Sequence, residues 1–339
     1  MCYIRFMNSE QHPIDSSYTY SQLAAEPARQ FVEAHYKLGA RLSCKFFVLG
    51  LHDNYLLESD DKKYILRIYR NNWRSKDEIQ FELELLAFLG RQNARVADPL
   101  LTKDSDLTFY IDSPEGQRAA ALFHYANGHA PGNNISPQQS YLLGSAVANI
   151  HHLSETFESS YSRPVLDLPF LLDESIAVLG SFIGTEGMDY LATVQQKLRR
   201  DIPSIPNDSS TFGICIGDVN PTNFHIDGRE QITLFDFDQC GYGHRAFEIG
   251  KFISSIHHIK IKQEIAKSFI SGYESSRPLS DVEHSAIPYF EIVAVIWVMA
   301  IHAYNADRIG HKWLDKAFWD KRLATLKELY NAVDQSPVN

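Results

Sequence analysis

An acid, an amide and a second acid lie close together in the last third of the sequence: Asp218, Asn223 and Asp236. A glycine and a proline around the first two favour a turn, because proline cannot continue a helix or a central strand. Residues 224–227 and 232–235 are typical of two short strands joined by a tight turn. Such a hairpin would return the carboxylate of Asp236 towards Asn223. One acid could then accept a proton while the amide and the other acid bind a hard cation, which is what phosphoryl transfer requires.

The spacing Asp-x-x-x-x-Asn followed by Asp-Phe-Asp resembles the catalytic core of the aminoglycoside phosphotransferase and choline kinase superfamily, relatives of the protein kinases. Those enzymes usually carry His-Gly before the first acid, and Ile216 stands here at the histidine position. The resemblance implies that Asp218 orients or deprotonates the acceptor hydroxyl. It also implies Mg²⁺ ligands at Asn223 and Asp236, with Asp238 as an additional ligand. The alternative is an acidic hairpin whose carboxylates are merely solvated.

The composition limits the class of protein. At 339 residues the chain exceeds one ordinary domain, and two lobes sharing a cleft are expected. A hydrophobic fraction of 44%, a charged fraction of 22% and a net charge of −10 indicate a globular protein without a general nucleic-acid-binding face. The four cysteines form no Cys-x-x-Cys pair, which indicates free thiols in a reducing cytoplasm.

No segment of the sequence predicts a membrane association. The opening residues, 1–17, are mixed and polar, unlike a signal peptide. The most apolar run, 287–301, is too short to span a bilayer and contains Glu291, so a buried helix is expected there.

Alternation and helical periodicity predict an α+β fold, and the resemblance implies that it is a bilobal protein-kinase-like fold. After an irregular arm over 1–20, the amino-terminal part should contain helices at 27–36 and 75–91 and strands at 44–49, 55–58, 63–69, 107–111 and 118–124. Tight turns make these five strands antiparallel, with the second helix inserted after the third strand. Beyond a glycine-rich hinge, helices are expected at 137–153, 168–179, 190–200, 246–258, 263–273, 287–304 and 314–332. The predicted lobes are therefore residues 1–125, which bind the nucleotide, and 126–339, which carry the catalytic and acceptor-binding residues.

A cation on the third strand, facing a carboxylate on the next helix, is the kinase device for holding the α- and β-phosphates. Strand alternation points Arg67 away from its apolar neighbours. By resemblance Arg67 takes the position usually held by lysine, and the alignment pairs it with Glu82. Glu78 and Glu84 are competing partners, and an arginine reaching solvent is the alternative without function.

The resemblance also supplies nucleotide-binding positions whose sequence signal is weak. Gly50 and Asn54 stand where the phosphate-covering loop of the family lies. The stretch around Phe123, His124 and Ala126 looks like the adenine-binding hinge. There the His124 carbonyl and the Ala126 amide would pair with the base, with Phe123 behind it.

The final helices are the region that walls the acceptor pocket in the family. Trp297, Tyr304 and Trp313 could contact an amine or a sugar there by cation–π contact and stacking. Aromatic residues at helical spacing are otherwise core residues. The histidine pair at 151–152 cannot chelate a metal as a unit, because adjacent helical residues point about 100° apart, and the family often has a structural histidine at His151. Glu248 stands where the family commonly has an aspartate that braces the catalytic loop.

The sequence therefore predicts an ATP- and Mg²⁺-dependent phosphotransferase, a kinase, that moves the γ-phosphate to a hydroxyl of a small molecule. A nucleotide-binding pseudokinase acting as an interaction module is one alternative, motivated by Ile216 and Arg67. A Ser/Thr protein kinase of the same superfamily is the other. It ranks lower because no long activation segment separates Asp236 from Glu248.

Overall fold

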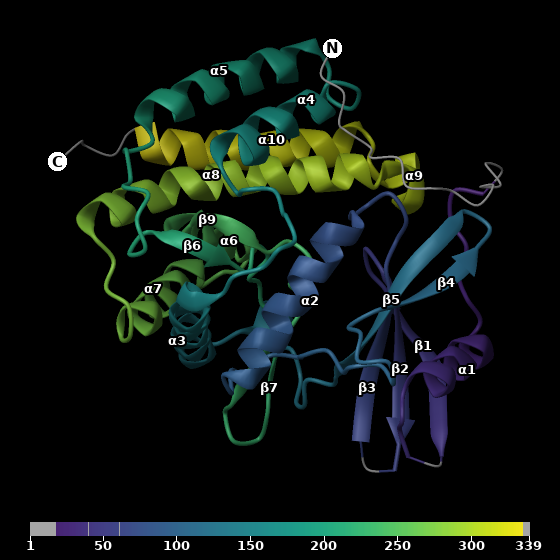
Figure 1. Cartoon of the computed structure of the whole chain (residues 1–339). Helices are drawn as coiled ribbons and strands as arrows, with labels where there is room; N and C mark the ends of the chain where they lie inside the picture. The colour runs from purple at the N-terminus through teal and green to yellow at the C-terminus, as the bar shows by residue number, and fades with distance from the viewer. Residues whose placement is uncertain (1–17, 40, 61, 335–339) are drawn as a thin grey trace. The chain divides into compact units, whose positions relative to one another are not determined.

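The computed structural model describes residues 18–39, 41–60 and 62–334. The chain divides into two compact units (Figure 1). Unit 1 is formed by the residues up to Glu84 together with Asp98–Tyr125, and unit 2 by Leu85–Ala97 together with the residues from Ala126. The division differs from the predicted lobes in residues 85–97, which belong to unit 2. Most of the arm predicted over 1–20 lies outside the described residues.

Unit 1 is built on a five-stranded sheet in the order β1-β2-β3-β5-β4. Every neighbouring pair is antiparallel. Its elements are α1 (Ala25–His35), β1 (Leu42–Leu49), β2 (Asp53–Ser59), β3 (Lys62–Ile68), the first part of α2 (Lys76–Arg91), β4 (Phe109–Ser113) and β5 (Gly116–His124). The predicted antiparallel sheet, with its helix after the third strand, is confirmed.

The two faces of this sheet have different roles. Tyr55, Leu57 and Leu66 are completely buried on the face that packs with α1. Side chains alternate along each strand, so Arg67 must lie on the opposite face, level with Asn54 on β2 and Ala121 on β5. The apolar alternation therefore presents Arg67 on the face away from α1.

Unit 2 is mainly helical and contains two small two-stranded sheets. Its helices include α3 (Pro137–Leu153), α4 (Ser175–Leu179), α5 (Thr185–Asp201), α6 (Arg245–Ser255), α7 (Lys262–Glu274), α8 (Asp281–Tyr304), α9 (Ala306–Ile309) and α10 (Lys316–Asp334). Strand β6 (Phe212–Cys215) pairs with β9 (Gly241–His244), and β7 (Phe224–Ile226) pairs with β8 (Ile232–Leu234). A π-helical turn (Pro169–Glu174) runs directly into α4.

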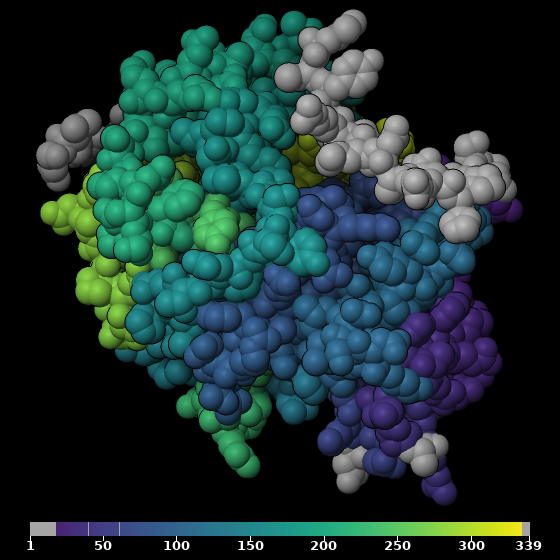
Figure 2. Space-filling view, in the orientation of Figure 1, coloured from purple at the N-terminus to yellow at the C-terminus, as the bar shows by residue number. Residues whose placement is uncertain are grey.

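Helix α8 forms the centre of unit 2. It begins at a capping box in which Ser280 accepts from the Glu283 amide and the Glu283 side chain accepts from the Ser280 amide. It packs on α6, α4 and α10, and in Figure 2 it is largely hidden behind the teal segments of the chain. Gly250 of α6 allows a close approach, because a Cβ there would lie 2.7 Å from the Glu291 amide nitrogen.

The same helix is long and apolar enough to cross a membrane by length and composition alone. However, 61% of its most apolar window is buried inside the protein, as in the core helix of a globular domain, and one such helix is weak evidence for a span. The predicted buried helix over 287–301 is confirmed.

Candidate active site

The loop between β6 and β7 carries Asp218 and Asn223, and it begins at a glycine that its geometry requires. Gly217 has φ +83°, and a Cβ at this position would lie 2.1 Å from the Gln239 carbonyl oxygen. A left-handed backbone this close to another backbone carbonyl excludes every residue with a side chain. The loop therefore turns sharply just before Asp218.

The side chains of Asn223 and Lys251 hold the Asp218 carboxylate, and Asn223 also holds its backbone carbonyl. Asn223 Nδ2 donates to Asp218 Oδ2 at 2.9 Å and to the Asp218 carbonyl oxygen at 3.0 Å. Lys251 Nζ donates to Asp218 Oδ1 at 2.6 Å. The Asp218 side chain remains 32% exposed. It is therefore both positioned and accessible, as a residue that orients an acceptor hydroxyl must be.

The β7–β8 hairpin brings the second acid next to the loop, as the spacing predicts. The Phe235 amide donates to the Asn223 carbonyl oxygen at 3.1 Å, which places Asp236 beside Asn223. Asp236 has φ +64°. A non-glycine residue in the left-handed region stores backbone strain, and such strain gathers at functional positions.

The acid two residues further on lies in a different environment. Asp238 is 2% exposed, whereas Asp236 is partly exposed. Asp238 Oδ2 accepts from Gln239 Nε2 at 3.1 Å, and its carbonyl oxygen accepts from Arg163. The two acids are therefore not equivalent, and Asp236 is the better placed candidate for a cation ligand. A metal-binding role for Asp238 remains a prediction.

Glu248 on α6 holds the backbone of the loop between β6 and β7. Its carboxylate accepts from the Gly217 amide at 2.9 Å and from the Ile216 amide. Ile216, at the usual histidine position, is 1% exposed. Its contribution to the loop is its backbone N–H, which any residue except proline supplies, so an apolar side chain is accommodated there.

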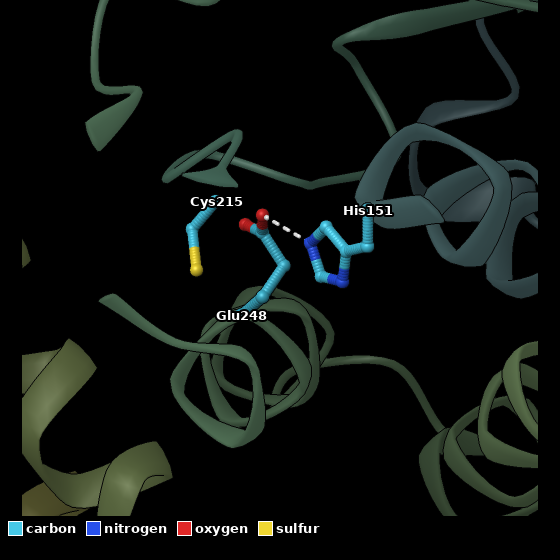
Figure 3. A group of neighbouring side chains, drawn as sticks. All are labelled: His151, Cys215 and Glu248. Carbon is cyan, nitrogen blue, oxygen red and sulfur yellow. Dashed lines mark hydrogen bonds and ion pairs between the residues drawn. The ribbon is translucent and has the colours of Figure 1, made fainter. Parts of the chain in front are cut away.

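Glu248 also belongs to a cluster of three buried side chains, together with His151 and Cys215 (Figure 3). The atoms of these residues that could bind a metal lie within 4.8 Å of one another. His151 Nε2 donates to Glu248 Oε2 at 3.4 Å, and the Tyr273 hydroxyl donates to His151 Nδ1 at 2.8 Å. Burial lowers the pKa of His151 and raises the pKa of Cys215 well above its usual value.

This group is a structural brace. A metal would need a carboxylate oxygen, but both Glu248 oxygens already accept backbone amides and Oε2 also accepts from His151. The structural role expected for His151 is in agreement with these contacts.

Unit 1 contains the ion pair that the sequence predicts for phosphate binding. Arg67 Nη1 lies 3.0 Å from Glu82 Oε1, and the side chains are 11% and 0% exposed. The competing acid Glu78 pairs with Arg74 instead, at 3.3 Å. The guanidinium also lies over the Phe123 ring, 5.3 Å from its centroid. Arg67 is thus held from two sides with a planar, charged group partly exposed.

Gly50 lies in the turn between β1 and β2, and Asn54 lies at the start of β2. The Gly50 amide and Asn54 Nδ2 both donate to the His52 carbonyl oxygen, at 3.1 and 3.2 Å. Asp53 is completely buried, and its Oδ2 accepts from Arg118 Nη2 at 2.7 Å. This buried pair anchors the turn. Sequence reasoning missed it, because the two residues are 65 positions apart.

The predicted adenine-binding residues lie at the end of β5 and just beyond it. His124 Nδ1 bonds to Asp98 Oδ1 at 2.9 Å, and this hydrogen bond raises the pKa of His124. The first residue of unit 2's second segment, Ala126, accepts from His225 Nδ1 at 2.5 Å through its carbonyl oxygen. Phe123 is 6% exposed. Contact of these residues with a base remains a prediction.

The three aromatic residues expected to line the acceptor pocket are in different environments. Trp297 is 4% exposed and packs edge-on against Phe247, so it is a core residue of unit 2. Tyr304 and Trp313 are 42% and 73% exposed. The resemblance suggested a pocket role for all three, but Trp297 has the core role that its helical spacing indicates. The structure leaves only Tyr304 and Trp313 accessible to a ligand.

Lys251 is the residue of the site that sequence reasoning did not find. It is 3% exposed and follows Glu248 by one helical turn, so one face of α6 holds both the loop backbone and the Asp218 carboxylate. The sequence did contain one indication of this role: a lysine within a mainly apolar helix, since lysine is rarely buried without a partner.

Comparison with known proteins identifies the family. The sequence model of the phosphotransferase enzyme family matches residues 43–282. The chain belongs to this family. It is therefore a phosphotransferase of the kinase type, as the motif around Asp218 predicts. An uncharacterized protein of Synechocystis sp. (strain ATCC 27184 / PCC 6803 / Kazusa) is 36% identical over 91% of this chain and 86% of its own.

Solved structures of low sequence identity share the fold. A microcompartment-associated aminopropanol kinase has a TM-score of 0.74 at 21% identity, covering 91% of this chain and 96% of its own. The amicoumacin kinase hAmiN, in complex with AMP-PNP, Ca²⁺ and Ami, also has a TM-score of 0.74, at 18% identity over 93% of this chain and 94% of its own. The predicted kinase-like fold is confirmed.

Proposed function

We propose that this family member transfers the γ-phosphate of ATP, as its Mg²⁺ complex, to a hydroxyl of a small molecule. Asp218 accepts a hydrogen bond from the attacking hydroxyl and orients it. Arg67, positioned by Glu82, neutralises the nucleotide phosphates. Catalysis then consists mainly of positioning and electrostatic stabilisation, as in other phosphoryl transfers.

The observation that carries the proposal is the arrangement of Asp218, Asn223 and Asp236 in unit 2. Asp218 is held by Asn223 at 2.9 Å and stays partly exposed. The strained backbone of Asp236 directly follows the strand that hydrogen bonds to Asn223. Strain at a partly exposed acid beside an oriented carboxylate is the mark of a functional position.

The residues present suit a magnesium ion. Both hydrogen bonds of the Asn223 amide to Asp218 use its nitrogen, so the oxygen Oδ1 points elsewhere. Among the described residues, Oδ1 receives only a long contact of 3.4 Å from Thr222 Oγ1. An amide oxygen and a carboxylate are hard ligands of the kind Mg²⁺ takes alongside water and phosphate oxygens. When bound, the metal would neutralise charge on the transferring phosphate.

Thermal unfolding with ATP or ADP, each with and without Mg²⁺, tests the nucleotide site. Ligand that binds the folded state raises the midpoint by mass action. We expect a Mg²⁺-dependent rise with ATP in the wild type and its loss in Asp236→Ala. Asp320→Ala, which removes an exposed acid paired with Lys316, is the matched control and should keep the rise.

The outcomes distinguish the alternatives. Nucleotide binding without phosphate transfer to any acceptor would favour a pseudokinase that serves as an interaction module. Labelling of serine-containing proteins, with poor turnover of hydroxylated metabolites, would favour a protein kinase. The burial of Ile216 weakens the first alternative, because the departure that motivated it leaves the loop's backbone contacts in place.

We place the reaction in the cytoplasm, where ATP is supplied and thiols stay reduced. Cys44 and Cys215 carry free thiols. The partner is a small-molecule acceptor.

A further inference from the structure

The ammonium group of Lys251 lies on the opposite side of the Asp218 carboxylate from the proposed metal ligand. Asn223 donates to Oδ2, whereas Lys251 donates to Oδ1. In phosphoryl transfer the metal and the nucleotide phosphates belong to the Asn223 side. The acceptor hydroxyl must reach the same carboxylate from the remaining side. Lys251 therefore marks the acceptor side of the loop.

The Lys251 ammonium group has more N–H donors than there are acceptors around it. A lysine carries three N–H groups, and among the described residues its one hydrogen-bond acceptor is Asp218 Oδ1, at 2.6 Å. The side chain is only 4% exposed, so bulk water reaches it poorly. Buried donors are normally satisfied, and those that are not call for a functional explanation. Two N–H groups of Lys251 therefore have no acceptor among the described residues.

A pocket beside the same loop has a matching charge. It has a volume of about 410 Å³, within the range of small-molecule sites. It is lined by Asn133, Asn134, Ile135, His258, Ile259, Lys260 and Ile261. One wall is tied to the catalytic loop, because the Gly132 amide donates to the Pro221 carbonyl oxygen at 3.1 Å. The lining contains a lysine and a histidine and no carboxylate, so it offers no counter-charge to a cationic acceptor.

We propose that Lys251 is an acceptor-binding residue and that the acceptor is an alcohol carrying a carboxylate or phosphate close to its reacting hydroxyl. One ammonium can serve Asp218 and the acceptor's anionic oxygen together, because its N–H groups point in different directions. The lysine then selects acceptors by charge as well as holding Asp218. This inference rests on the proposed function and specifies its substrate class.

Four three-carbon alcohols keep the hydroxyl group and vary the charge: glycerate, glycerol 3-phosphate, neutral glycerol and cationic 3-amino-1,2-propanediol. Their binding to the full chain loaded with Mg·ADP can be measured by saturation-transfer NMR. We expect at least one of the two anions to bind about tenfold more tightly than glycerol, the gain of one charge-assisted hydrogen bond. Comparison of glycerate with glycerol 3-phosphate identifies which anion the site takes.

Lys251→Met should abolish the preference, and Lys251→Arg, which keeps the charge, should retain part of it. Lys327→Met is the matched control: it removes an exposed lysine that lies over the Tyr190 ring, and the preference should be unchanged. Equal binding of all four alcohols, absence of binding by both anions, or a preference for the amine would overturn the proposal. So would an anion preference that survives in Lys251→Met.

The failure of this inference can be told from the failure of the proposed function. The Mg²⁺-dependent thermal shift with ATP is measured on the same wild-type preparation. A shift with ATP but no preference for anions contradicts only the role of Lys251. Absence of the shift contradicts the kinase function itself.

Discussion

Each unit buries one glutamate beside a candidate functional residue, and the two are held in different ways. Glu82 in unit 1 and Glu248 in unit 2 are both 0% exposed. Glu82 accepts from the Arg67 guanidinium at 3.0 Å and from the Tyr69 hydroxyl at 3.3 Å. Glu248 accepts from the backbone amides of a loop. The first carboxylate orients a charge and the second fixes a backbone.

This difference sets the consequence of removing each carboxylate. Arg67 without Glu82 keeps its charge, loses its fixed direction and stays partly exposed to water. The two loop amides without Glu248 would be buried donors with no acceptor, which is costly for the fold. Changes at Glu82 should therefore appear in nucleotide binding, and changes at Glu248 in stability and loop geometry.

The largest effect is expected at Asp218, the residue that the Glu248 brace positions. Asp218→Asn keeps the shape but removes the negative charge that orients the hydroxyl, so turnover should fall by about 10²- to 10⁴-fold. ATP affinity should change little, whereas the unfolding midpoint should fall because the buried Lys251 loses its ionic partner. Turnover and the thermal shift with Mg·ATP are the measurements. This loss of turnover is the upper limit for any substitution that acts only by misplacing Asp218. Unchanged turnover would show that Asp218 has no part in the mechanism.

Glu248→Gln should have the next largest effect, because glutamine offers one acceptor oxygen to two buried amides. One orphaned donor should lower the free energy of unfolding by about 1–3 kcal/mol. Turnover should fall with it while ATP affinity in the folded protein is unchanged. Urea unfolding and nucleotide titration measure the two quantities. If Glu248→Gln weakened ATP binding and left stability intact, the comparison between the two glutamates would be wrong.

Glu82→Gln should give the reverse pattern. Without the ionic partner Arg67 loses its fixed orientation, and Mg·ATP affinity should fall by about tenfold, the equivalent of one weakened charge-assisted contact. The free energy of unfolding should change less than in Glu248→Gln. Arg67→Lys is the informative companion, since it keeps the charge and removes the planar fork. A wild-type ATP affinity in Glu82→Gln would indicate that Arg67 is positioned sufficiently by Phe123.

The sequence predicts those features of the molecule that depend on residues close together in the chain. Strand alternation around Arg67 determines the face on which it lies, and the five-residue interval between Asp218 and Asn223 determines their contact. The hydrogen bond from Lys251 to Asp218 spans 33 residues and depends on how α6 packs below the loop, so no local pattern indicates it. Helical spacing alone likewise could not show whether Trp297 faces the core or the acceptor pocket.

A third glutamate extends the comparison to a carboxyl group without a hydrogen-bond partner. Among the described residues, no hydrogen bond or ion pair involves the side chain of Glu291 on α8. Burial raises its pKa from 4.5 to about 7, and the charge of Lys262 opposes the shift in part. The folded protein therefore holds this carboxyl protonated at a pH where the unfolded chain ionises it. Stability from this group is present at low pH and is lost as the pH rises from 4.5 through 7.

Glu291→Gln, which mimics the protonated form, should remove this pH dependence. Between pH 5 and pH 8 the wild type should lose about 2 kcal/mol more unfolding free energy than the variant does. Urea unfolding at several pH values measures the difference, and Glu186→Gln, which changes an exposed glutamate on α5, is the control that should follow the wild type. If the variant and the wild type lost stability in parallel, Glu291 would already be ionised at pH 5. A partner such as Lys262 would then compensate it as Arg67 compensates Glu82.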